Sequence, residues 1–157
     1  MKVVPKPVTR RTRVVRPAPA MERPPERPVL IVDDNEDILA TARVILERNG
    51  FRVATRVLAP EWVDLQELQP CVVFMDINLG RESGLNACAS IKDNPRFAEL
   101  PVILISGLDG ERLADAATRC RADGFLTKPY SPDLLVKLAW HYGKQATDKR
   151  TPNRSLS

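Results

Sequence analysis

The sequence predicts an α/β fold in which a doubly wound parallel sheet is covered by helices on both faces. Three short apolar runs, at 29–32, 71–75 and 102–105, contain no polar residue, as expected for strands that are buried on both sides. Segments with helical periodicity separate these runs. Strands that alternate with helices through short connections form βα units, and consecutive βα units build a three-layer sandwich.

The predicted elements follow one another in a regular order. After the first strand, Ile38, Ala42, Ile45 and Leu46 recur at helical spacing, and the Asn-Gly pair at 49–50 ends this helix. The second helix has the weakest pattern. In chain order we predict strands at 29–32, 51–54, 71–75, 102–105 and 123–127, and helices at 38–48, 60–68, 83–93, 110–121 and 132–142.

The two ends of the chain differ in composition from the part between them. Residues 1–27 alternate proline with arginine and lysine, and such a stretch cannot bury enough apolar surface to fold. The formal net charge of +4 combines +6 for residues 1–28, +3 for residues 144–157 and −5 for the segment between them. We therefore predict a disordered arm at 1–27, one folded domain at 28–143 and a polar tail at 144–157.

Cysteine content and hydropathy indicate the cellular setting. Cys71, Cys88 and Cys120 are odd in number and lie in apolar surroundings, which favours buried reduced thiols over a disulfide framework. No segment reaches the roughly 18 consecutive apolar residues that a membrane span needs. We expect a cytoplasmic protein without a membrane span.

Polar residues that could react stand where the predicted strands end. Asp33 and Asp34 follow the first strand, and Asp76 follows the third. Ser106 follows the fourth strand, and Lys128 closes the fifth. The carboxyl ends of the strands of a doubly wound sheet lie at one edge, where such folds bind ligands. We therefore predict that these five residues converge on a single site.

Three carboxylates at one site repel each other unless a cation joins them, and Mg²⁺ prefers this kind of oxygen ligand. A carboxylate can also accept a phosphoryl group, and that transfer depends mainly on neutralising and positioning the phosphoryl oxygens. Lys128 and the Ser106 hydroxyl could each contact one oxygen. The simpler alternative is that Asp33 and Asp34 only cap the first helix.

The residues at these positions resemble the motifs of bacterial response-regulator receiver domains. The matching segments are Val32-Asp33-Asp34, Met75-Asp76-Ile77-Asn78-Leu79, Gly84, Ile105-Ser106-Gly107 and Phe125-Leu126-Thr127-Lys128-Pro129. In order and spacing they follow the family pattern from about Pro28 to Tyr142. The resemblance implies a flavodoxin-like fold with about five helices and five parallel strands in the order 2-1-3-4-5.

The resemblance also implies a role for each residue of the site. Asp76 is the implied phosphoacceptor, and Lys128 and Ser106 are the implied contacts of the phosphoryl group. Ser106 and Phe125 form the implied switch pair that responds to phosphorylation, and the peptide bond before Pro129 is expected to be cis. The implied ligands of Mg²⁺, or of Mn²⁺ in its place, are Asp33, Asp34, Asp76 and the main-chain carbonyl of Asn78.

One position departs from the family pattern. Gly80 stands where many receivers have proline. Because glycine adopts more backbone conformations than proline, we expect the loop after Asp76 to be more mobile than in those receivers. This departure leaves the chemistry of the site unchanged.

Our first functional hypothesis is a receiver-only response regulator of a two-component phosphorelay. Its donor would be a histidine kinase or a histidine phosphotransfer protein, and its output a contact with an unidentified downstream protein. We expect neither a nucleic-acid-binding domain nor turnover as an enzyme, and homodimer formation stays open. Two alternatives remain: a receiver-shaped scaffold that works without phosphorylation, and an aspartate-nucleophile phosphatase of the haloacid dehalogenase type, although Asn78 stands where that type has its second acid.

Overall fold

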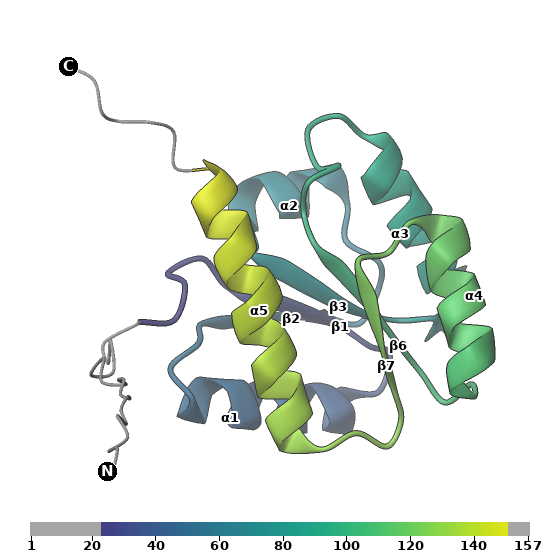
Figure 1. Cartoon of the computed structure of the whole chain (residues 1–157), viewed down its shortest axis with the longest axis horizontal. Helices are drawn as coiled ribbons and strands as arrows, with labels where there is room; N and C mark the ends of the chain where they lie inside the picture. Colours follow the sequence, from purple (N-terminus) through teal and green to yellow (C-terminus); the bar gives the residue numbers. More distant parts are fainter. Residues whose placement is uncertain (1–22, 151–157) are drawn as a thin grey trace, which may run out of the picture.

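A computed structural model of the protein describes residues 23–150 and contains a five-stranded parallel sheet (Figure 1). The strand order is β2-β1-β3-β6-β7, which is the predicted order 2-1-3-4-5 when the two short strands of a separate hairpin are left out. The predicted fold class is therefore confirmed. The strands of the sheet are β1 (Val29–Val32), β2 (Val53–Arg56), β3 (Val72–Asp76), β6 (Val102–Ser106) and β7 (Gly124–Thr127).

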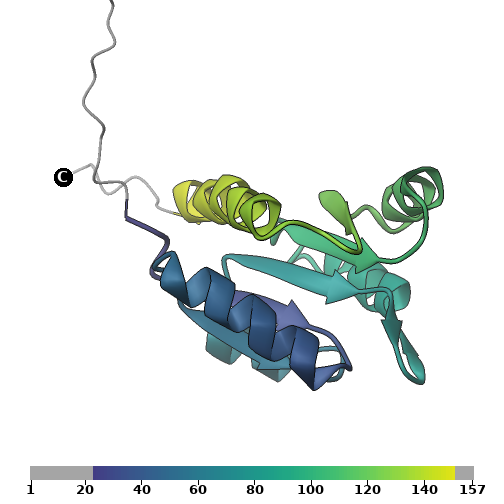
Figure 2. The ribbon, with the colours of Figure 1, turned by 90° about the horizontal axis from the view of Figure 1, so that it is seen from below.

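Helices cover both faces of the sheet and complete a three-layer sandwich (Figures 1 and 2). Residues of α1 and α5 pack in one core, and residues of α2, α3 and α4 pack in a second core on the opposite face. The five helices are α1 (Glu36–Arg48), α2 (Trp62–Leu68), α3 (Gly84–Asp93), α4 (Gly110–Cys120) and α5 (Pro132–Arg150).

The alternation of side chains along each central strand divides the sheet residues between the two cores. In β1, Val29 and Ile31 belong to the core under α1 and α5, whereas Leu30 and Val32 belong to the other core. The whole of β1 is buried, and so are β3 and β6. This burial explains why the three central strands read as uninterrupted apolar runs.

Side-chain caps fix where the first and third helices begin. Asn35 precedes α1 and accepts hydrogen bonds from the backbone N–H groups of Asp37 and Ile38. Ser83 caps α3 in the same way, through the N–H groups of Leu85 and Asn86. The N-cap of α1 is therefore neither Asp33 nor Asp34, so both aspartates remain for the site.

The structure corrects two of the predicted domain boundaries. The arm was predicted to reach residue 27, but Arg27 is anchored to the domain because its guanidinium donates to the carbonyl oxygens of Gln69 at 2.8 Å and Pro70 at 2.7 Å. At the other end, α5 runs to Arg150 although the tail was predicted to begin at 144. Lysine, glutamine and alanine have high helix propensity, so the helix continues past Gly143 once its preceding turns are packed. The remaining parts of both predicted ends, 1–22 and 151–157, lie outside the described residues.

A short hairpin follows Asp76, and the sequence did not predict it. It consists of β4 (Asn78–Leu79) and β5 (Glu82–Ser83), which pair antiparallel. Gly80 lies at its turn with a φ of 71°, a value that glycine adopts without strain and proline cannot adopt. The departure from the family pattern therefore corresponds to a defined turn.

The three cysteines are all buried and free of disulfide bonds, as predicted. Burial raises the pKa of the Cys71 thiol to about 11. Within residues 23–150, no helix combines the length and the apolarity needed to cross a membrane.

Candidate functional site

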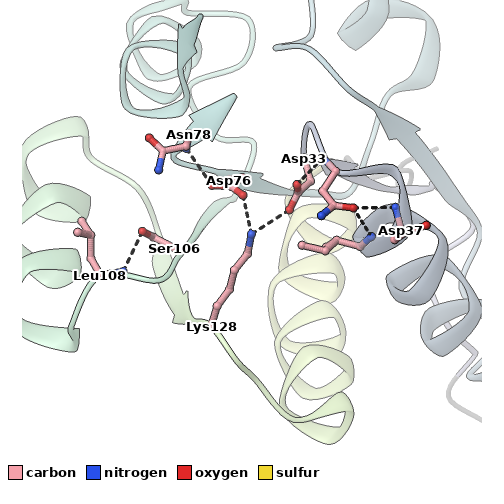
Figure 3. A network of polar contacts seen from close by, with 9 residues as sticks. Asp33, Asp37, Asp76, Asn78, Ser106, Leu108 and Lys128 are labelled. Carbon is pink, nitrogen blue, oxygen red and sulfur yellow. Dashed lines mark hydrogen bonds and ion pairs between the residues drawn. The ribbon is translucent and has the colours of Figure 1, made fainter. Parts of the chain in front are cut away.

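Asp33, Asp76, Ser106 and Lys128 lie at the carboxyl edge of the sheet (Figure 3), and Asp34 directly follows Asp33 in the chain. Asp76 is the last residue of β3 and Ser106 the last of β6, while Asp33 directly follows β1. The neighbours of β1 in the sheet are β2 on one side and β3 on the other, so the strand order reverses here. Asp33 and Asp76 are therefore at the point where doubly wound sheets bind their ligands.

Lys128 joins two of the carboxylates. Its Nζ donates to Oδ2 of Asp76 at 2.6 Å and to Oδ2 of Asp33 at 3.1 Å (Figure 3). The side chains of Asp33 and Asp76 are 3% and 9% exposed, whereas that of Lys128 is 25% exposed. One partly accessible ammonium thus links two nearly buried carboxylates that are 43 positions apart in the chain.

Burial and ion pairing shift the pKa of Asp33 and of Lys128 in opposite directions. Burial raises the pKa of Asp33, and the hydrogen bonds from Asn35 and Lys128 offset this rise only in part. For Lys128, burial alone would lower the pKa, but the hydrogen bonds and charges of Asp76 and Asp33 outweigh burial and raise it. The site therefore keeps Lys128 protonated at neutral pH.

Asp34 completes a cluster that has the character of a cation site. One carboxylate oxygen from each of Asp33, Asp34 and Asp76 lies within 4.8 Å of the other two. Asp34 is exposed, which leaves the cluster open to solvent on one side. A set of carboxylate oxygens with room for water suits a hard divalent cation such as Mg²⁺, and a single ammonium neutralises only part of the charge of three carboxylates.

Asn78 begins the hairpin next to Asp76 (Figure 3). Its backbone N–H donates to Oδ1 of Asp76 at 2.8 Å, and its side chain is exposed. Since Oδ2 of Asp76 accepts from Lys128, each oxygen of this carboxylate has a fixed donor. Use of the Asn78 main-chain carbonyl as a metal ligand stays a prediction.

The two switch residues differ in exposure. Ser106 is buried, and its Oγ accepts a hydrogen bond from the Leu108 N–H at 3.1 Å. Phe125, on β7, is 40% exposed. The switch role of these two residues stays a prediction. The Lys128–Pro129 peptide bond is cis, as the resemblance predicts.

A comparison with known protein families decides what kind of domain this is. A family described as response regulator receiver domain matches residues 29–139, which is most of the chain. The chain belongs to this family. It is a receiver domain of the two-component response regulators, and the resemblance drawn from its motifs is confirmed.

Several curated proteins share this receiver domain. Protein PilG of Pseudomonas aeruginosa is 34% identical over 111 residues, which cover 69% of this chain and 81% of that protein. Response regulator Rre1 of Synechocystis sp. is 33% identical over 68% of this chain but only 47% of its own length. The chain thus spans about half the length of some relatives that it matches.

Solved receiver structures have the same fold. The receiver domain of NtrX from Brucella abortus is 32% identical with a TM-score of 0.65, and the match covers 76% of this chain and 98% of that one. The chemotaxis protein CheY4 of Vibrio cholerae has a TM-score of 0.67 at 22% identity, over 73% of this chain and 96% of that one, which supports the fold alone.

Two contacts of this receiver's site were not identified from the sequence. Gly84 was quoted as a family motif without a physical role, yet a Cβ at this position would clash with the main-chain oxygen of Asp76. Glu82 was assigned only to the loop after Asp76, without a partner, although its carboxylate accepts a hydrogen bond from the Ala59 N–H. The first depends on how closely the start of α3 approaches Asp76, and the second on how the loop after Asp76 packs against Ala59, so no spacing rule would have found either.

Proposed function

We propose that the protein is a phosphoacceptor response regulator whose Asp76 takes a phosphoryl group from the phosphohistidine of a histidine kinase or a histidine phosphotransfer protein. The observation that carries this proposal is the pairing of Lys128 with both Asp76 and Asp33 inside a cluster of three carboxylates. Such a site holds a nucleophilic carboxylate, a fixed cation and ligands for a metal ion in one place.

In the transfer, a carboxylate oxygen of Asp76 attacks phosphorus, the phosphorus–nitrogen bond to the donor imidazole breaks, and an acyl phosphate forms. The electron pair of the broken bond stays on the imidazole. Mg²⁺ bound by Asp33, Asp34 and Asp76 would neutralise phosphoryl oxygens during this step. Lys128 would exchange its bond to Asp76 for one to a phosphoryl oxygen, and the Ser106 hydroxyl would meet another.

This role makes the protein a substrate of its donor rather than an enzyme that turns over free phosphate esters. A haloacid dehalogenase type phosphatase needs a second acid two residues after its nucleophile, and that position is Asn78. An amide cannot act as a general acid. The scaffold alternative predicts that partner binding is unaltered when Asp76 is replaced by alanine.

Incubation with acetyl phosphate and Mg²⁺ is expected to add the mass of one phosphoryl group, because the paired and metal-bound carboxylate can accept it without a kinase. Intact-protein mass spectrometry measures the gain. The Asp76→Ala variant and a sample with excess chelator should show none. Equal gain in the Asp76→Ala variant would contradict the assignment of Asp76, and no gain in the wild type with either acetyl phosphate or a phosphorylated histidine phosphotransfer protein would contradict the proposal.

Phosphorylation is further expected to change the surface formed by α4, β7 and α5. The Ser106 hydroxyl would move from the Leu108 N–H toward the phosphoryl group, and Phe125 would turn inward into the space this opens. This surface would bind the downstream protein. Crystal structures with and without a beryllium fluoride mimic test the change, and identical positions of Ser106 and Phe125 in both would contradict it.

A further inference from the structure

The hairpin after Asp76 is small, and little of it is fixed by its own pairing. Its two strands have two residues each, with Asn78 opposite Ser83 and Leu79 opposite Glu82. Two-stranded hairpins of this kind are marginal in water without further contacts. The base of the hairpin is held by the buried side chain of Leu79 and by the hydrogen bond from the Gly84 N–H to the Ile77 carbonyl at 2.7 Å.

The outer part of the hairpin is held by Glu82. Oε2 of Glu82 accepts a hydrogen bond from the Ala59 N–H at 2.9 Å. Ala59 lies in the connection between β2 and α2, more than twenty positions away in the chain. Within residues 23–150, the hairpin forms no other hydrogen bond to a segment apart from the adjoining β3 and α3.

The position of the hairpin affects the phosphoacceptor directly. The first hairpin residue, Asn78, donates its backbone N–H to Oδ1 of Asp76 (Figure 3). A shift of the hairpin therefore moves both the main chain of Asn78 and the orientation of the Asp76 carboxylate. Asp76 contributes one of the three oxygens of the acidic cluster, so the shape of the cluster depends on this donor.

We propose that Glu82 is a positioning residue for the metal site, holding the hairpin against the β2–α2 connection so that Asn78 and Asp76 keep the geometry that binds a divalent cation. This inference rests on the proposed function for the identity of the site. The Glu82 carboxylate acts through the Ala59 hydrogen bond and does not contact the cation itself. Because linkage is reciprocal, cation binding in turn strengthens the Ala59–Glu82 contact.

Mg²⁺ titrations of the full chain, followed by amide NMR without any phosphoryl donor, test this inference. The Glu82→Ala variant removes the acceptor and is expected to bind Mg²⁺ about three- to tenfold more weakly, the range that corresponds to one net hydrogen bond. Glu82→Gln keeps an oxygen that can accept from Ala59 and should bind nearly as well as the wild type. Glu67→Ala removes the same charge from an exposed position on α2 and should leave the Kd unchanged.

A second readout follows the Ala59 amide itself. Saturating Mg²⁺ should slow its hydrogen exchange in the wild type, and this protection should be absent in Glu82→Ala. A thermal melt of each variant shows whether it is folded, since loss of one exposed hydrogen bond should leave the domain intact.

The outcomes separate this inference from the proposed function. An unchanged Kd in Glu82→Ala would overturn the positioning role while leaving the metal site in place. Equal weakening by Glu82→Gln or by Glu67→Ala would also overturn it, because charge alone would then be responsible. A wild type with no saturable Mg²⁺ binding would overturn both the metal part of the proposed function and this inference.

Discussion

Replacing Gly84 by alanine is expected to lower the free energy of unfolding by about 3 kcal/mol, since the added methyl group meets backbone rather than a movable side chain. A Cβ at this position would lie 2.9 Å from the carbonyl carbon of Asp76 and 3.0 Å from Cα of Ile77, and closer still to the Asp76 oxygen. The start of α3 must therefore move away from β3. Chemical denaturation of the two proteins measures the loss.

The same substitution should also reduce phosphoryl uptake, because the displaced backbone belongs to the phosphoacceptor. The matched control is Gly110→Ala at the first position of α4, where a Cβ meets nothing within 4 Å. That variant should be as stable as the wild type or slightly more stable. Equal stability of Gly84→Ala and the wild type would show that the α3 start is not confined by Asp76.

The central part of the fold could be predicted because burial on both faces leaves a clear sequence signal. The apolar runs of β1, β3 and β6 were assigned within one residue. The edge strand β2 was placed two residues too early, at 51–54 instead of Val53–Arg56, since its residues are all half-buried and its pattern is weak. The end of α5 was missed because the polar sequence after Gly143 has no apolar periodicity.

The position of the candidate site residues at one edge of the sheet could be predicted, but their contacts could not. Asp76 ends β3, and Asp33 and Lys128 directly follow β1 and β7. Parallel strands bring their carboxyl ends to one edge of the sheet regardless of the side chains there. The Glu82–Ala59 hydrogen bond depends on how a hairpin folds against a loop from another βα unit. No sequence periodicity indicates such a contact, so this hydrogen bond could be identified only from the structure.

Replacing Lys128 by methionine is expected to lower the free energy of unfolding by about 3 kcal/mol at neutral pH. This value is near the lower end of the range for removing one partner of a buried ion pair, because the lysine side chain is 25% exposed. The substitution keeps most of the packing but leaves Asp33 and Asp76 nearly buried without their cation. Lys137→Met, at an exposed position of α5, is the control and should change stability little.

The loss of unfolding free energy in the Lys128→Met variant should become smaller at acidic pH. The folded-state pKa of Lys128 is raised above 10.5, so its stabilising contribution is fully present below pH 10.5 and is lost only as the pH rises through the folded value. The pKa of Asp33 is raised above 3.8 by burial, and loss of Lys128 removes one of the groups that hold it down. Protonation of Asp33 therefore favours the folded variant, and the difference from the wild type should narrow as the pH falls from neutral toward about 4.

Mg²⁺ should reduce the difference in unfolding free energy between the wild type and Lys128→Met at neutral pH, because a divalent cation can replace the positive charge that the variant lacks. In the variant no ammonium repels a cation that the three carboxylates bind, so they should hold Mg²⁺ more tightly than in the wild type. Denaturation curves at several Mg²⁺ concentrations measure this. If neither acid nor Mg²⁺ reduces the stability loss of Lys128→Met, Lys128 stabilises the fold through the packing of its methylene chain. The carboxylates of the cluster would then be neutralised by other groups.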